Sequence, residues 1–170
     1  MTGVKRGLIA ALTALTLTGL AGGLPEASGD DRLADSQARP SRSANRGPCD
    51  EERWLHITPR EWTPQLVKGL IRCAVRRWPV SGGADFAVRV AECESSLYPW
   101  AYANRNAGVF QHRIDYWVGR VDRYLRPQWF NQRQWERLHE LPRGAFHTRA
   151  NVLISIRMAH AGGWGPWSCA

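Results

Sequence analysis

The chain has 170 residues, which is room for one domain of ordinary size. Hydrophobic residues make up 44% of it, enough to build a core, and the formal net charge is +8. Lysine occurs only at Lys5 and Lys68, and the absence of a long basic run argues against a nucleic-acid-binding tail. The charge is compatible with an anionic membrane or an anionic polymer, such as a bacterial cell wall, as partner.

Residues 1–27 have the order of a secretory signal peptide. Lys5 and Arg6 precede an apolar run over residues 8–20, and small residues follow it. The run is shorter than the roughly 20 apolar residues that a membrane span needs. We therefore expect cleavage after Ala21 or Ala27, with an uncleaved anchor as the alternative. The sequence predicts a secreted protein without a stable membrane span after cleavage.

Residues 28–48 are polar, rich in Ser, Arg and Asp, and nearly free of large apolar side chains. Such a segment cannot offset its ordering entropy by burial, so a disordered linker is predicted. The folded domain is expected over residues 49–170.

Four cysteines lie in that domain, at Cys49, Cys73, Cys93 and Cys169. An even number in an exported chain predicts two disulfides, for which three pairings are possible. A helical hairpin favours Cys73 with Cys93 and leaves Cys49 for Cys169; a reactive Cys93 thiol is the less favoured interpretation. The chain has no C-x-x-C and its histidines are scattered, so neither a metal site nor a cofactor is expected.

The domain is predicted to be mainly helical. Thr63 and Pro64 are typical of a helix start, and Trp78-Pro79 with the following Ser81-Gly82-Gly83 of its end. Further helices are predicted over residues 84–95, 114–125, 128–138 and 145–161, the last apolar on most sides and therefore the buried centre. Only residues 109–112 are expected to pair briefly as a strand.

Helical phase separates the two glutamates of the helix over residues 84–95. At roughly 100° per residue, the buried stripe is predicted along Phe86, Val90, Cys93 and Leu97. Glu92 falls on the opposite side, with Asp85 and Arg89, in an ordinary charged surface.

Glu94 falls about 80° from Phe86, on the margin of that stripe and in the last turn of the helix. Partial burial and the negative end of the helix dipole both raise the pKa of a carboxyl group there. A general acid must keep its proton near neutral pH, so Glu94 is a candidate catalytic acid, with a capping or salt-bridged role as the alternative.

The residues after Glu94 repeat a known pattern. Glu94-Ser95, Pro99 and then Gly108-Val109-Phe110-Gln111 resemble the signature of the lysozyme-like lytic transglycosylases, a type also found in exported actinobacterial wall proteins. The resemblance covers about residues 54–170. It implies a lysozyme-like fold, α+β with minimal strand, in which a single helical domain holds a substrate cleft.

The resemblance also implies roles for these residues. Glu94 would be the single acid/base that cuts the bond between N-acetylmuramic acid and N-acetylglucosamine in peptidoglycan. Ser95 would orient that acid or contact sugar, Gln111 would line the cleft, and Gly108 would let backbone turn or approach substrate closely. Without the resemblance, Ser95 is a helix-terminal hydroxyl and Gln111 a surface amide.

One part of the family pattern is missing. The family often carries A-Y-N-A-G near its end, whereas this chain has Ala159-His160-Ala161-Gly162, with His160 in place of the Asn and no Tyr. Candidate sugar-contacting aromatics are Trp100, Tyr102, Trp164 and Trp167, while Trp62, Trp78 and Trp117 are assigned to the core.

The mechanism depends on whether a second carboxylate exists, since glycosidases usually use two. Asp115 is the nearest in sequence, but its position suits helix capping. We therefore expect the substrate's own N-acetyl group to stabilise the transition state and a 1,6-anhydro product to form. A muramidase-type hydrolase and a catalytically weak wall-binding module are the alternatives. The protein is expected to be a monomer whose partners are peptidoglycan strands and anionic wall polymers.

Overall fold

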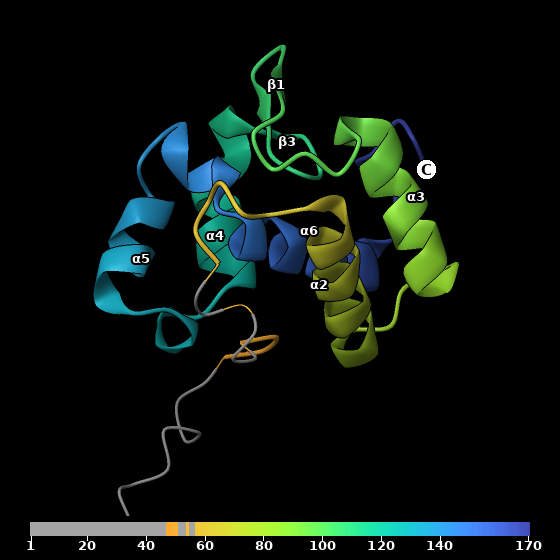
Figure 1. The fold of residues 1–170 in the computed structure, drawn as a ribbon, viewed down its shortest axis with the longest axis horizontal. Helices are drawn as coiled ribbons and strands as arrows, with labels where there is room; N and C mark the ends of the chain where they lie inside the picture. The colour runs from red at the N-terminus through yellow and green to blue at the C-terminus, as the bar shows by residue number, and fades with distance from the viewer. Residues whose placement is uncertain (1–46, 51–53, 55–56) are drawn as a thin grey trace, which may run out of the picture. The chain divides into compact units, whose positions relative to one another are not determined.

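The computed structural model describes residues 47–50, 54 and 57–170 (Figure 1). The signal peptide and nearly all of the linker predicted from the sequence lie outside these residues. The helices are α2 (Pro64–Arg77), α3 (Gly83–Ser95), α4 (Trp117–Tyr124), α5 (Gln132–Leu138) and α6 (Thr148–Gly162), with short 3-10 turns at Ile114–Tyr116, Pro127–Trp129 and Arg143–Phe146. The described part is thus mainly helical, as predicted. None of its helices has the length and hydrophobicity to cross a bilayer.

Helix α6 is the centre of the core. Every residue from Thr148 to Ile156 is buried, and α2 and α4 both pack on this helix (Figure 1). Helix α2 begins as its sequence predicts, with the Thr63 hydroxyl accepting the Leu66 N–H at 3.3 Å and Pro64 in the first turn. It ends at Arg77, and its C-cap residue Trp78 stands immediately before a proline.

A small antiparallel sheet projects from one side of the described domain, at the top of Figure 1. Its strands are β1 (Tyr102–Ala103), β2 (Asn106–Ala107) and β3 (His112–Arg113). The prediction of a strand near residues 109–112 was therefore misplaced, because residues 108–111 form the turn between β2 and β3. Strands of two residues are too short to show the alternation on which a sequence-based prediction depends.

The buried face of helix α3 overlaps only in part with the one predicted, since Val90 and Leu97 are buried but Phe86 is only partly buried. Its buried residues are Ala87, Val88, Val90 and Ala91, and Cys93 is exposed. At roughly 100° per residue, the buried arc extends from about 40° to about 200° beyond Phe86. Glu94 therefore lies within this arc rather than on its margin.

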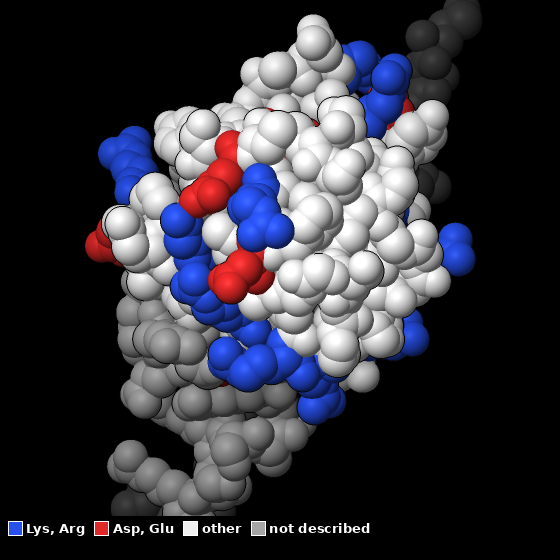
Figure 2. Space-filling view, turned by 90° about the vertical axis from the view of Figure 1, so that its right-hand side faces the viewer, with Lys and Arg blue, Asp and Glu red and all other residues white. Residues whose placement is uncertain are grey.

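The charged side of α3 faces solvent, as expected for Glu92. Figure 2 shows the side of the molecule where α3 lies, with a band of basic side chains interrupted by acidic ones. Glu92 pairs with Lys68 of α2 at 2.6 Å, and Asp85 pairs with Arg72 at 3.6 Å. Because these pairs are exposed, each contributes at most about 1 kcal/mol to stability.

Two disulfides are present, as predicted, but the favoured pairing was wrong. Cys49 bonds to Cys73, and Cys93 bonds to Cys169. Helices α2 and α3 do pack together, but their buried faces exclude Cys73 and Cys93. Cys93 instead lies on the exposed side of α3, where the C-terminal segment reaches it.

The two bonds should differ in their effect on stability, because they close loops of 24 and 76 residues. Chain entropy predicts a loss of about 3.5 kcal/mol when Cys49 and Cys73 are replaced by serine, and about 4.5 kcal/mol for Cys93 and Cys169. Urea unfolding of both double variants measures the difference. A larger loss for the shorter loop would contradict the loop-closure account.

Candidate functional site

Glu94 is a half-buried carboxyl in the last turn of α3. Burial raises its pKa, and a hydrogen bond from the backbone N–H of Cys169 opposes part of that effect. The Cys93–Cys169 disulfide holds this N–H beside the helix. The raised pKa favours retention of the proton, which is the property required of a general acid.

Ser95 joins the end of α3 to the turn between β2 and β3. Its Oγ lies 2.7 Å from the carbonyl oxygen of Val109 and 3.2 Å from that of Ala91. A hydroxyl has a single proton to donate, and the Val109 carbonyl is the nearer acceptor. The geometry therefore favours positioning of the turn beside Glu94 over the predicted sugar contact.

Gly108 and Gln111 form the two ends of that turn. Gly108 has φ +80°, and a Cβ there would lie 2.6 Å from the carbonyl oxygen of Ala145, so neither the conformation nor the space admits a side chain. The Gln111 Nε2 donates to the carbonyl oxygens of Ala101 at 3.1 Å and Gly108 at 2.9 Å. The Gln111 amide thus stabilises the loop through two hydrogen bonds to its backbone.

Asn151 organises the same turn and was not singled out in the sequence. Its Oδ1 accepts the N–H of Phe110 at 2.9 Å, and its Nδ2 donates to Ala107 at 3.1 Å and Ala145 at 2.9 Å. The side chain is fully buried in α6. The sequence could have pointed to Asn151 because it precedes the apolar run of residues 152–154. An amide buried there needs hydrogen-bond partners from elsewhere in the chain.

Two of the predicted sugar-stacking aromatics belong to the core. Trp164 and Trp167 are buried, and their rings pack against each other at 5.2 Å. The Trp164 indole N–H donates to Ser81, and that of Trp167 donates to Phe110. The described structure therefore offers neither ring as an open stacking surface.

The other predicted contact residues lie at the surface. Tyr102 is exposed on β1, and Trp100 is 41% exposed in the loop before it. His160 is exposed near the end of α6, where its Nδ1 lies 2.7 Å from the carbonyl oxygen of Pro79. The structure thus does not gather all the predicted site residues into one cavity.

Asp115 is not a helix cap, contrary to its sequence-based interpretation. It is paired with Arg105 and lies 3.0 Å from the Arg113 Nε, while the residue that caps α4 makes no side-chain capping bond. These guanidinium groups lower the pKa of Asp115. Its carboxylate is held as an ion-pair partner rather than left available as a catalytic base.

A buried histidine of β3 contacts a buried serine of α6. The Nε2 of His112 lies 2.7 Å from the Ser155 Oγ, and its Nδ1 lies 2.7 Å from Arg120. Burial and the charge of Arg120 lower the pKa of His112 to about 3, so it is neutral. Ser155 also contacts the carbonyl oxygen of Asn151, is fully buried, and has no access to a substrate.

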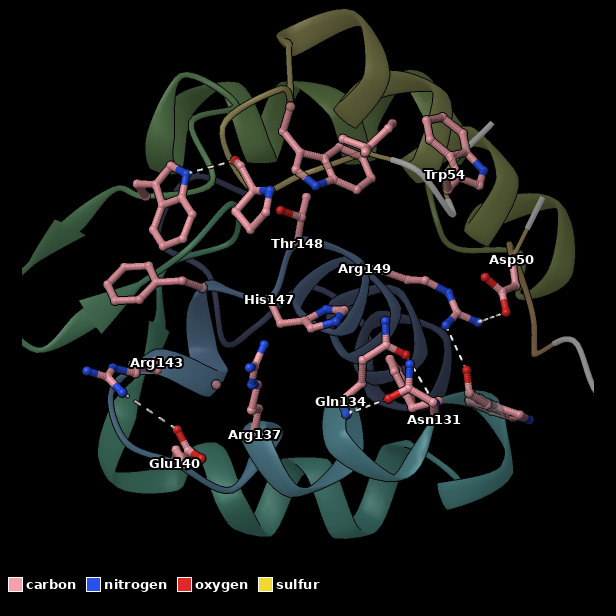
Figure 3. Close-up of a pocket in the computed structure, with 18 of the residues that line it drawn as sticks. Asp50, Trp54, Asn131, Gln134, Arg137, Glu140, Arg143, His147, Thr148 and Arg149 are labelled. Carbon is pink, nitrogen blue, oxygen red and sulfur yellow. Dashed lines mark hydrogen bonds and ion pairs between the residues drawn. The ribbon is translucent and has the colours of Figure 1, made fainter. Parts of the chain in front are cut away.

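The larger of two notable cavities is a cleft of about 1100 Å³ (Figure 3). One wall is aromatic, the opposite wall consists of α5 and the following 3-10 turn, and the start of α6 lies between them. Its lining includes Trp54, Trp62, Trp100, Phe146, Asn131, Gln134, Arg137, Glu140, Arg143, His147, Thr148 and Arg149. A second cavity of about 220 Å³ includes Gln111 and Trp167 in its lining. Glu94 lines neither cavity.

Comparisons with protein-family models, curated proteins and solved structures give no match.

The candidate site thus consists of Glu94 and the residues that hold its surroundings. Ser95, Gly108 and Asn151 fix the neighbouring turn, and the Cys169 N–H contacts the carboxyl. The described residues include no group of three or more His, Cys, Asp or Glu side chains that would hold a metal ion. This arrangement suits proton transfer by a single carboxyl group.

Proposed function

We propose that the protein is an exported, wall-associated peptidoglycan glycosidase of the lytic transglycosylase type. The observation that carries the proposal is Glu94, a half-buried carboxyl with a raised pKa at the end of α3. The signature-like residues Ser95 and Gly108–Gln111 support it, because they build the turn that adjoins this helix end. The two disulfides agree with an oxidising compartment outside the cell.

In the proposed reaction, protonated Glu94 donates its proton to the glycosidic oxygen between N-acetylmuramic acid and N-acetylglucosamine. The bond to the anomeric carbon breaks, and the substrate's N-acetyl oxygen stabilises the positive charge that develops. The Glu94 carboxylate then accepts the proton of the C6 hydroxyl as that oxygen bonds to the anomeric carbon. Asp115 is already held by two guanidinium groups, which supports a mechanism with one carboxyl.

Mass analysis of the soluble products released from purified peptidoglycan tests this proposal. We expect 1,6-anhydro ends, which are lighter than hydrolysed ends by one water molecule. Hydrolysed ends would indicate instead a muramidase-type hydrolase that uses Glu94 as its acid. If the protein binds the walls but releases no soluble product, both the transglycosylase and the hydrolase assignments would be contradicted.

The second candidate function is a wall-binding module with weak or no turnover. It is favoured by the C-terminal segment, where Trp164 and Trp167 are packed in the core and His160 lies beside the Pro79 carbonyl. These residues follow or replace the family's Tyr and Asn, so that side of the site departs from the pattern. Sedimentation with purified walls, without release of product, is the outcome that identifies this function.

A further inference from the structure

The large cleft is chemically separate from Glu94. Its 1100 Å³ lie between the aromatic segment that contains Trp62 and the wall formed by α5, and Glu94 is absent from its lining (Figure 3). Pockets of this size with fixed aromatic surfaces and a few polar groups are typical of ligand sites. What the cleft recognises therefore does not depend on whether Glu94 is catalytic.

The aromatic wall is held in place by its own contacts. Trp54 and Trp62 stack at 5.7 Å with 11° between their planes, and Trp100 stacks with Phe146 at 5.6 Å. The indole N–H of Trp100 donates to the carbonyl oxygen of Pro59 at 3.0 Å. Aromatic faces are electron-rich, and the C–H groups on one face of a pyranose ring carry the complementary partial charge. Sugars are therefore a class of ligand that fits this wall.

Among the described residues, one arginine of the cleft has no ion-pair partner. Arg149 lies 4.0 Å from Asp50, and Arg143 lies 4.0 Å from Glu140. The guanidinium of Arg137 has neither an ion pair nor a hydrogen bond to the part of the chain that the structure describes. Figure 3 shows it directed into the cleft, below His147. A guanidinium presents paired donors that match a carboxylate.

The start of α6 adds further donors. His147 accepts the Ala150 N–H on its Nδ1 at 3.3 Å, so when neutral it carries its proton on Nε2. Burial lowers the pKa of His147 to about 4, which keeps it neutral. Thr148 lines the cleft, is 5% exposed, and its hydroxyl has no hydrogen-bond partner among the described residues. The cleft thus offers donors to a ligand rich in acceptor oxygens.

We propose that this cleft is a second, non-catalytic site that binds a carboxylate-bearing sugar of the uronic acid type, with the sugar ring on the Trp62 and Trp100 wall and its carboxylate on Arg137. The acceptor-rich hydroxyls and carboxylate of such a sugar match the donors of Arg137, His147 and Thr148. Acidic polysaccharides are polymers that carry this unit.

Titration of the full chain with cellobiouronic acid and with cellobiose tests the site, because the two disaccharides differ by a carboxylate in place of a hydroxymethyl group. Tryptophan fluorescence reports binding, since four tryptophans line the cleft: Trp54, Trp62, Trp100 and Trp129. We expect the acid to bind at least about tenfold more tightly than the neutral sugar, from a charge-assisted hydrogen bond. Equal binding of the two sugars, or no binding of either, would overturn the proposal.

Arg137→Gln should abolish the preference for the acid while leaving weak binding of cellobiose. Arg133→Gln is the matched control, because Arg133 is exposed on the same helix and does not line the cleft. A preference unchanged in Arg137→Gln, or lost equally in both variants, contradicts the assignment.

Glu94→Gln should leave binding of both disaccharides unchanged. The sugar titration therefore tests this cleft independently of whether Glu94 cleaves peptidoglycan. Acetate alone should not compete at equal concentration, since it lacks the sugar ring.

Discussion

Replacing Glu94 by glutamine should reduce the release of soluble muropeptides from purified peptidoglycan by at least about 100-fold. Glutamine has nearly the shape of glutamate but cannot donate a proton to the glycosidic oxygen or accept one afterwards. The pKa of Glu94 is raised by burial, so the neutral amide should be accommodated at this position without unfolding. Release of product is measured by chromatography, and folding by circular dichroism and thermal unfolding.

Glu92→Gln provides the matched control two residues earlier on the same helix. Glu92 is on the exposed side and pairs with Lys68, so its loss should cost at most about 1 kcal/mol and leave product release unchanged. If the Glu94 variant releases product as fast as the parent, the catalytic assignment is wrong. Equal losses in both variants would indicate a general effect of charge on wall binding instead.

Asn151→Ala should have the largest effect on stability among single substitutions near the site, a loss of about 3–5 kcal/mol in the free energy of unfolding. The substitution leaves the buried N–H of Phe110 and the carbonyl oxygens of Ala107 and Ala145 without the partner that now satisfies them. Each unsatisfied buried group costs about 1–3 kcal/mol. Denaturant unfolding measures the loss, and the turn beside Glu94 should loosen with it.

Asn131→Ala is a suitable comparison because Asn131 makes hydrogen bonds at the exposed start of α5. Loss of such a cap costs about 0.5–2 kcal/mol. Should the two asparagine variants lose the same stability, the bonds of Asn151 would contribute no more than those of an exposed cap, and its assigned role in holding the turn would be wrong.

The helices were predictable because their start and stop signals are local. Thr63 and Pro64 begin α2, and the apolar composition of α6 identified the buried centre. The buried face of α3 was misassigned in part because large residues such as Phe86 and Cys93 were weighted above Ala87 and Ala91. Small side chains bring helix backbones close together, and their burial depends on a partner helix that sequence periodicity does not specify.

The features that the sequence did not predict depend on contacts between distant residues. Asn151 reaches a turn 41 residues earlier, and Trp167 bonds to a carbonyl 57 residues earlier. Trp62 was assigned to the core, and it does pack against the core while partly buried. It also lines the large cleft, which the sequence did not reveal because the other side of that cleft comes from the distant residues of α5. Helical phase placed Glu94 on the margin of the predicted apolar stripe and Glu92 on the opposite side, and the structure leaves Glu94 partly buried within the buried arc of α3.

The two disulfides also determine how the domain would respond to a mechanical load. Tension applied between Cys49 and Cys169 passes through the first disulfide to Cys73, along the backbone to Cys93, and through the second disulfide. Only the segment between residues 73 and 93 can be drawn out, to about 70 Å at the length of extended chain, against about 400 Å without the bonds. Glu94, the sheet and the large cleft all lie outside that covalent path. Stretching the oxidised domain would therefore unwind the last turn of α2 and most of α3, up to Cys93, while the rest of the chain carries no direct force.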